Sequence, residues 1–310
     1  MSSRKPFRTP AAVLTALVTL IIGLLGIAPA QAAVSTNPNA QTWQVLVGNQ
    51  TPDMAIQGMR FLPGEIWIHQ TDSIKFVSNS AEIHTVSYGT PPLPPTSREN
   101  LEADAFTPVG GPVFDPTAPW TNSGIIAPPV PGAPFIQSYQ LKFAAPGTFT
   151  FYCLIHSKVM NIVVHVLHKQ ATLPHTQAYY DGQASVQSAQ VIADGKALWA
   201  STAAKASPTH VFAGAADGQA MVMRFIPSLD TVRNGTTVTF DMSANQVLVP
   251  HTVTFTTLMQ GGKLVDSGTL LPAPAGPRAF NVTFDQIGRW HYLCEFHDDM
   301  GMVGDVVVTP

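Results

Sequence analysis

Two short motifs in this sequence place a histidine three residues after a cysteine, and at least one methionine follows each motif. A His-Thr-Val segment precedes each motif in the chain. The residues of the two groups are His84, Cys153, His156 and Met160 in the first, and His251, Cys294, His297, Met300 and Met302 in the second. Thiolate, imidazole and thioether groups in such a set are ligands for a soft or borderline transition metal.

The donor set suits copper in both of its common oxidation states. Soft sulfur ligands favour Cu(I), whereas imidazole accepts Cu(I) and Cu(II). A thiolate and two imidazoles near one plane, with a weak thioether above it, need little rearrangement when one electron is gained or lost. The sequence therefore predicts up to two copper ions per chain, one in each group.

The cysteines and methionines allow other interpretations. The chain has two cysteines, which could form a disulfide in an oxidising compartment. A disulfide leaves unexplained why each cysteine has the same histidines around it. Zinc also binds cysteine and histidine, but a thioether is a weak zinc ligand. Met160 could instead be a core residue, because methionine commonly fills gaps in apolar cores.

The two groups belong to a longer internal repeat. Residues 59–61, Met-Arg-Phe, return at 223–225, and the pattern of residues 143–153 returns at 284–294. Together with His-Thr-Val, three blocks recur in the same order, which predicts two duplicated domains. The first copy is longer mainly between residues 90 and 134, where many prolines and glycines predict a long surface loop.

The segments between these blocks predict an all-β fold. Both copies contain short runs rich in β-branched and aromatic residues, bounded by turn formers, as is typical of sandwiches and barrels. Such strands are expected at 43–47, 73–77, 84–88, 138–143, 236–240, 251–255, 280–284 and 305–309. Residues 177–205 lack proline and repeat apolar residues at helical spacing, which predicts a helix. The expected domains are 40–168 and 210–310, joined by a partly helical linker at 169–209.

The N-terminus predicts export. A basic start at residues 4–8 is followed by an apolar run at 11–28 and by Ala-Gln-Ala at 30–32, which is typical of a secretory signal peptide. Residues 1–32 are therefore expected to be removed, and the protein to be extracellular, at the cell surface or periplasmic. The alternative is an uncleaved anchor, which would make this segment the one membrane contact.

The residues around the second motif resemble a known family. The run from Tyr292 to Gly304, Tyr-Leu-Cys-Glu-Phe-His-Asp-Asp-Met-Gly-Met-Val-Gly, is similar to the ligand loop of plastocyanins and pseudoazurins, which are cupredoxins. Residues 249–253, Val-Pro-His-Thr-Val, resemble the first-histidine strand of that family. The resemblance implies two tandem cupredoxin-like Greek-key sandwich or barrel domains, each binding one type 1 (blue) copper.

The same resemblance implies which methionines bind. In the second copy it places the axial ligand at Met302, whereas a shorter loop of the amicyanin kind would place it at Met300. In the first copy Asn161 stands where the longer loop has its methionine. Met160 is the expected axial ligand there, and an altered axial ligand changes the redox potential.

The resemblance implies an electron carrier rather than an enzyme. Two-domain relatives of the nitrite reductase or laccase kind add a second copper centre, typically with a histidine directly before the blue-copper cysteine and with His-x-His pairs elsewhere. Here Tyr152 and Leu293 precede the cysteines, and the chain has no His-x-His. An oxidoreductase with an unrecognised second copper site and a copper-buffering protein remain the alternatives.

The expected partners are redox proteins that bind transiently. The loop histidine, His156 or His297, lies at the surface edge in this family and would be the exit point for the electron. A charged fraction of 11% and a net charge of −3 give no electrostatic reason to expect nucleic acid.

Overall fold

The computed structural model describes residues 40–93, 98–156 and 159–310, and most of their regular structure is in three β-sheets. The predicted signal peptide at residues 1–32 lies outside these ranges. Within them, no helix is long and apolar enough to cross a membrane. The all-β expectation is confirmed, with residues 40–168 and 210–310 called copy one and copy two below.

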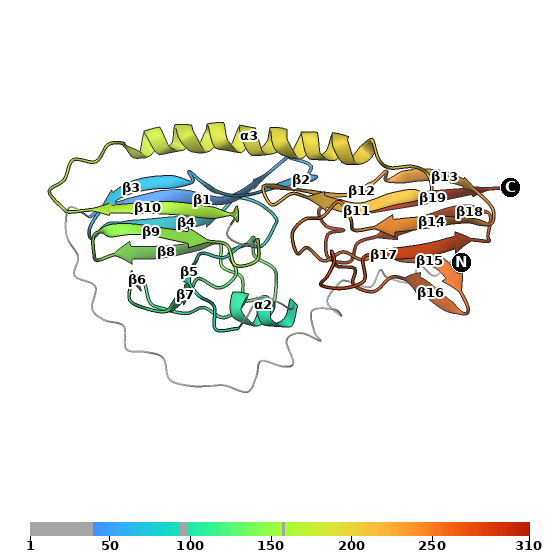
Figure 1. Ribbon diagram of the computed structural model, residues 1–310, viewed down its shortest axis with the longest axis horizontal. Coiled ribbons are helices and arrows are strands. Elements are labelled where there is room, and N and C mark those ends of the chain that lie inside the picture. The colour runs from blue at the N-terminus through green and yellow to red at the C-terminus, as the bar shows by residue number, and fades with distance from the viewer. Residues whose placement is uncertain (1–39, 94–97, 157–158) are drawn as a thin grey trace, which may run out of the picture. The chain divides into compact units, whose positions relative to one another are not determined.

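One sheet of nine strands runs through both copies (Figure 1). Its order is β17 (Ala279–Phe284), β14 (Thr236–Asp241), β11 (His210–Ala216), β12 (Ala220–Ile226), β2 (Ile56–Leu62), β1 (Thr42–Gln50), β4 (Ser73–Ser78), β8 (Ser138–Phe143) and β6 (Val113–Phe114). Each copy adds a five-stranded sheet to its half of this long sheet. In copy one that sheet is β3 (Glu65–His69), β10 (Asn161–Leu167), β9 (Gly147–Tyr152), β5 (Ser87–Gly89) and β7 (Trp120–Asn122). In copy two it is β13 (Leu229–Arg233), β19 (Val303–Thr309), β18 (Gly288–Leu293), β15 (Thr254–Gln260) and β16 (Lys263–Asp266).

Alternating side chains form the core of each copy. Every second side chain of β10 and β19 is buried, as expected for a strand with one face on a core. In copy one, Val45 and Phe76 of the long sheet belong to the same buried cluster as Ile66 and Val164 of the five-stranded sheet. In copy two the same cluster contains Phe240 of the long sheet and Val306 of the five-stranded sheet, so each copy is a two-layer sandwich.

The two histidine-led strands begin later than predicted. His84 and His251 each form a single bridge, to Ile126 and Leu270, and regular pairing starts only at Ser87 in β5 and Thr254 in β15. Neither histidine is therefore part of a regular strand. The loops that carry the two histidines make no regular strand pairing, so the histidine side chains can turn toward the cysteine motifs.

The two copies join through equivalent strands. β2 and β12 pair antiparallel, with Gln57 opposite Met221, and each of these residues stands two positions before the Met-Arg-Phe motif of its own copy. The flanking hydrogen bonds also match, because Met59 N donates to Gln219 O (2.9 Å) and Met223 N donates to Ala55 O (2.8 Å). Equivalent residues therefore meet their counterparts, as in the interface of a two-fold symmetric dimer.

The predicted linker helix crosses this junction. Helix α3 (Gln177–Ala203) begins at Thr176, whose hydroxyl accepts a hydrogen bond from Tyr179 N, and it lies over strands of both copies (Figure 1). Val191 packs with Ile56 of β2 and Ala220 of β12 in one buried cluster. The helix therefore holds the two copies together rather than linking them loosely, and the described residues of both copies belong to one compact unit.

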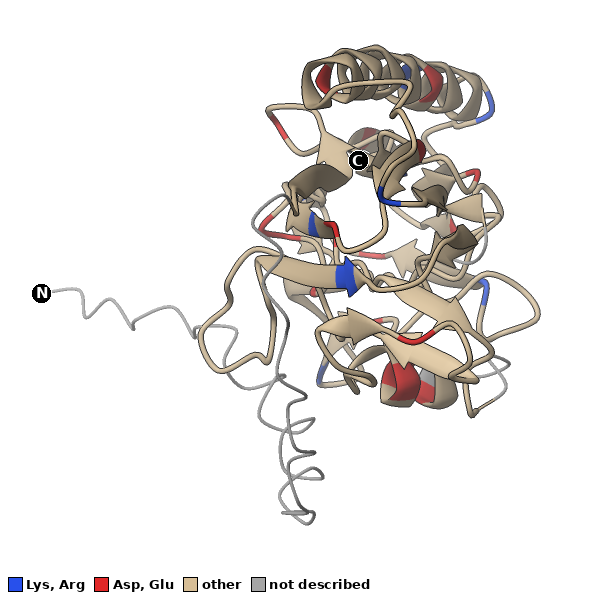
Figure 2. Ribbon diagram, turned by 90° about the vertical axis from the view of Figure 1, so that its left-hand side faces the viewer, with Lys and Arg blue, Asp and Glu red and all other residues tan. Residues whose placement is uncertain are grey.

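The long segment from residue 90 to 134 is more ordered than predicted. Beyond residues 94–97, which are not described, it contains the short helix α2 (Arg98–Ala105) and strands β6 and β7. The buried Asn122 side chain organises it, since its amide donates to the carbonyl oxygens of Asp104 (2.8 Å) and Thr107 (2.8 Å). Figure 2 shows acidic residues on α2, among few charged residues elsewhere.

Copy two carries a buried polar pair where copy one is apolar. Asp230 and Tyr292 occupy the positions that Ile66 and Phe151 hold in copy one, counted from the shared motifs. Asp230 is 3% exposed, and neither its Oδ2 nor the Tyr292 hydroxyl has a hydrogen-bond partner among the described residues. Burial raises the pKa of Asp230 from 3.8 to about 7. Ionised Asp230 is therefore unfavourable in the folded state.

This raised pKa predicts a pH-dependent stability. Folded Asp230 holds its proton more tightly than the unfolded chain does, so the free energy of unfolding falls as pH rises from about 4 to about 7. We expect Asp230→Asn to remove this fall and to raise the free energy of unfolding at pH 8 by about 1–2 kcal/mol. Urea denaturation of the metal-free protein at pH 5 and pH 8 measures both values. Equal pH dependence in the variant and the parent would contradict the assignment.

Candidate metal centres

Copy one brings its three predicted donors together. His84 comes from the loop before β5, and Cys153 and His156 follow β9. The Nδ1 atoms of the two histidines are 3.1 Å apart, and Cys153 Sγ lies 4.0 Å from His84 Nδ1 and 3.4 Å from His156 Nδ1. All three side chains are buried.

Copy two repeats this arrangement closely. His251 Nδ1 and His297 Nδ1 are 3.1 Å apart, and Cys294 Sγ lies 3.6 Å from the first and 3.4 Å from the second. The ring planes of the histidine pair differ by 66°, against 61° in copy one. Two segments with different intervening loops therefore produce the same triad.

The spacing of these donors fits one metal ion per triad. Bond lengths of about 2.0–2.1 Å to nitrogen and about 2.3 Å to sulfur, typical of zinc and close to those of its neighbour copper, place such donors roughly 3.1–3.8 Å apart. The measured separations of 3.1–4.0 Å lie in or near this range. Cys153 and Cys294 are free thiols in separate sites, which overturns the disulfide alternative.

The methionines that end the two loops are equivalent in the backbone. Cys153 N donates to Met160 O (2.9 Å), and Cys294 N donates to Met302 O (3.1 Å), so each methionine stands directly before the last strand of its copy. Both side chains are fully buried. Met300 differs, because its carbonyl accepts from Arg224 Nη1 (2.6 Å). This equivalence favours Met160 and Met302 as axial ligands, and their binding to a metal stays a prediction.

A threonine organises each cysteine from the neighbouring loop. Thr85 N donates to Cys153 Sγ, and Thr252 N donates to Cys294 Sγ, both at 3.4 Å. The Thr85 hydroxyl also accepts from Leu154 N, as Thr252 does from the amide after Cys294, both at 2.8 Å. These bonds orient the sulfur and would stabilise a thiolate. The threonine of His-Thr-Val was not singled out by sequence reasoning, although its place in the repeat was the available signal.

Burial determines the protonation of the metal-free triads. It lowers the pKa of His156 to about 3 and that of His297 to about 4, and it holds the pKa of His84 and His251 well below the usual range. The same burial raises the pKa of Cys294 to about 11. The imidazoles are therefore neutral and ready to bind, whereas the thiol must lose its proton when a metal binds.

A glycine lies behind the first histidine of each copy. Gly48 and Gly214 have positive φ angles of 74° and 72° at matching bulges of β1 and β11. A methyl group on Gly214 would lie 2.6 Å from His251 Nε2, and one on Gly48 would lie 2.5 Å from His84 Nε2. Sequence reasoning missed both glycines, because their role depends on a contact between distant segments.

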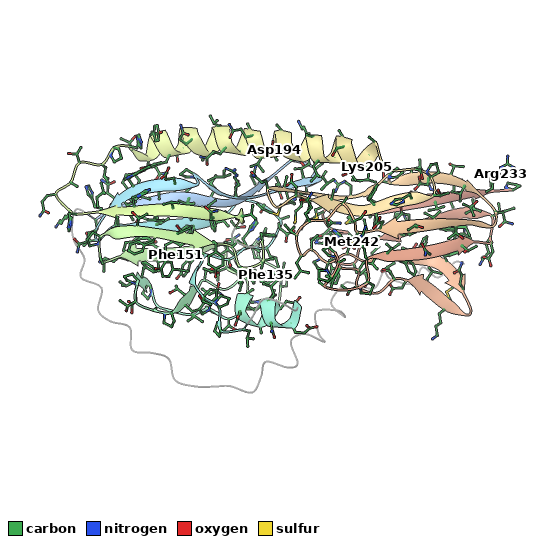
Figure 3. The ribbon with its side chains drawn as sticks, in the orientation of Figure 1. Phe135, Phe151, Asp194, Lys205, Arg233 and Met242 are labelled. Atoms are coloured by element: carbon green, nitrogen blue, oxygen red, sulfur yellow. The ribbon has the colours of Figure 1, made fainter. Side chains whose placement is uncertain are left out.

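The loop histidines are less accessible than the family resemblance implies. His156 is 2% exposed and His297 is 6% exposed, so neither lies open at a surface edge. Glu82, which sequence reasoning also missed, has a carboxylate oxygen 3.7 Å from His156 Nε2 and is itself buried. Figure 3 labels Phe151, two residues before Cys153 within the strands of copy one, and Met242 in the loops of copy two.

A family comparison agrees with the donor set of copy two. Residues 212–309 match the family model for copper binding proteins of the plastocyanin/azurin family. Among solved structures, a Cu(I) form of an amicyanin variant is 25% identical, covering 34% of this chain and 89% of its own, with a TM-score of 0.25. An oxidized plastocyanin from Dryopteris crassirhizoma is 20% identical, covering 32% of this chain and 99% of its own, with a TM-score of 0.26.

Proposed function

We propose that this chain, a cupredoxin by the match of its residues 212–309 to the plastocyanin/azurin family, is an electron-transfer protein with one type 1 copper in each copy. The observation that carries the proposal is the duplicated triad of one cysteine sulfur and two histidine Nδ1 atoms, buried in both copies. When bound there, copper supplies one-electron chemistry by alternating between Cu(I) and Cu(II).

The protein's own contribution is to hold the donors still. His84 and His251 are backed by a glycine of the long sheet, and both cysteines accept a hydrogen bond from a threonine amide. Cys153 and Met160 are further joined through the backbone, as are Cys294 and Met302. Donors fixed in this way before the metal binds keep one geometry for both oxidation states, which favours fast electron exchange over chemistry on a bound substrate.

Export and transient redox partners belong to the same proposal. The apolar N-terminal segment supports secretion, and mass spectrometry of the mature N-terminus would locate cleavage near residue 32. Charged residues are few in Figure 2, which fits a partner that binds briefly through a small, weakly charged interface. An oxidised protein partner outside the cytoplasm would take the electron.

Cysteine substitutions test the proposal. We expect the purified protein to bind two copper ions and to show an intense thiolate-to-copper absorption band. Cys153→Ser and Cys294→Ser should each remove one copper and about half of the band, because each triad has one thiolate. Copper analysis and the visible spectrum of the same samples measure both effects.

The outcomes separate the alternatives. If the parent protein binds one copper and only Cys294→Ser loses it, copy one is a structural domain without a metal. Catalytic turnover of nitrite or phenols would favour an oxidoreductase. Copper binding without a visible band, or without reversible one-electron reduction, would contradict the electron-transfer proposal and favour copper buffering.

A further inference from the structure

We propose that copy two is the built-in redox partner of copy one, with the two metal sites turned toward each other across the junction of the copies. This inference rests on the proposed electron-transfer function. One electron leaves one site as it enters the other, so the pair as a whole needs no outside oxidant, reductant or proton. Four features of the junction lead to it.

The first feature is the direction of the symmetric junction. β2 and β12 pair around Gln57 and Met221, close to the bulges that hold Gly48 and Gly214. Each of these glycines backs the first histidine of its own copy. Because the copies are related by a local two-fold axis at this point, both sites lie at the ends of the copies that meet.

The second feature is an arginine that ties the ligand loop of copy two to copy one. Arg224 Nη1 donates to Met300 O (2.6 Å), between His297 and Met302, and Arg224 Nη2 donates to Asp53 O of copy one (2.7 Å). Arg60 is the matching arginine of copy one, and it donates to Gln219 Oε1 (2.9 Å). Both arginines cross the junction, but among the described residues only Arg224 of these two donates to a ligand loop.

The third feature is that residues beside the ligands contact the other copy. Leu248, three residues before His251, packs against the cluster of copy one that contains Tyr152 and Leu154, the neighbours of Cys153. In the ligand loop of copy one, directly before Met160, Val159 lies 3.5 Å from where a methyl group on Gly218 of copy two would stand. Segments that flank each site therefore close over the junction.

The fourth feature is a buried carboxylate between the second histidine of copy one and the junction. Glu82 lies 3.7 Å from His156 Nε2, the edge of the ring that faces away from Cys153, and its Oε2 has no hydrogen-bond partner among the described residues. The Glu82 amide donates to Gln57 Oε1 (3.4 Å), and Gln57 stands opposite Met221 of copy two where β2 pairs with β12. The outer edge of His156 therefore lies on the side of copy one that meets copy two.

The junction is built to keep the sites at one separation. The long sheet is continuous across it, and α3 packs on strands of both copies. Two sites held in one rigid body need no diffusional encounter, so exchange between them is a first-order process that is independent of protein concentration.

Pulsed dipolar EPR on the full chain, with Cu(II) in both sites, tests the geometry. We expect one narrow distribution of distances between the two metal ions. After photoreduction that delivers one electron per chain, the electron should redistribute at a rate that does not change over a hundredfold dilution. The EPR spectra of Cys153→Ser and Cys294→Ser identify each site.

A matched pair of arginine variants sharpens the test. Arg224→Ala should broaden the distance distribution and slow redistribution about tenfold, because small displacements of reacting groups change rates strongly. Arg60→Ala should leave the distance distribution and the redistribution rate within about twofold of the parent values, since among the described residues its side chain contacts Gln219 rather than a ligand loop. A broad distribution, or a redistribution rate proportional to concentration, would overturn the inference while both blue bands persist. Loss of the blue bands or of one-electron reduction in the parent protein would instead refute the proposed function.

Discussion

Gly214→Ala is expected to disable the metal site of copy two and to leave that of copy one intact. The new methyl group would lie 2.6 Å from His251 Nε2 and 3.1 Å from the Val222 carbonyl oxygen. The carbonyl belongs to the long sheet and cannot retreat, so the histidine ring must move. Its Nδ1 atom would then leave the position 3.6 Å from Cys294 Sγ.

We expect Gly214→Ala to bind about one copper tightly per chain. The thiolate-to-copper absorption that remains should come from copy one. Losing one of three strong donors is expected to weaken binding by at least 10–100-fold, which is the effect of disturbing even the groups that orient metal ligands. Copper analysis after dialysis against a chelator measures this loss. In copy one, Gly48→Ala should act alike, because its methyl group would lie 2.5 Å from His84 Nε2 and would also overlap Ser80 Oγ.

A second glycine provides the control for backbone strain. Gly235 also has a positive φ angle, of 84°, but a methyl group there would meet no atom within 4 Å. Gly235→Ala should therefore destabilise the fold by about 1–3 kcal/mol without changing copper content. If Gly214→Ala and Gly235→Ala both keep two coppers, the histidine does not depend on the glycine behind it.

These glycines also mark what sequence reasoning could and could not predict. The triads were predictable because each copy repeats Cys-x-x-His and His-Thr-Val, and a duplicated pattern is evidence in itself. Met160 was harder to predict as the axial ligand, because the ligand loop of copy one is one residue shorter than that of copy two. Its equivalence with Met302 became visible only through the hydrogen bond from the cysteine amide.

The junction escaped prediction for a different physical reason. Strands β2 and β12 pair over a long sequence separation, and no local periodicity encodes such a contact. In the structure nearly every side chain of both strands is buried, without the alternation of β10 and β19. Such a strand is covered on both faces, here by the core and by α3. The apolar run Ala220–Met223 could have suggested that the predicted helix covers a sheet.

Gly195→Ala is expected to destabilise the folded protein, although alanine is a better helix former than glycine. Gly195 lies in α3 next to Asp194, which Figure 3 labels on the helix. A methyl group there would overlap Ile56 Cγ2 of β2 and would lie 3.2 Å from Ala220 Cβ of β12. The helix approaches the junction so closely that no side chain fits.

The sign of the change in stability depends on two opposing contributions. Replacing glycine by alanine within a helix contributes about 1 kcal/mol of stability, whereas forcing an extra methyl group into a packed contact costs about 1–3 kcal/mol and lifts the helix from both strands. We expect a net loss of up to about 2 kcal/mol in urea denaturation. Gly182→Ala is the matched control in the same helix, because a methyl group there meets no atom within 4 Å. It should gain up to about 1 kcal/mol. An equal gain for both variants would show that α3 does not press on the junction, and the fixed separation of the two metal sites would then depend on the strand pairing alone.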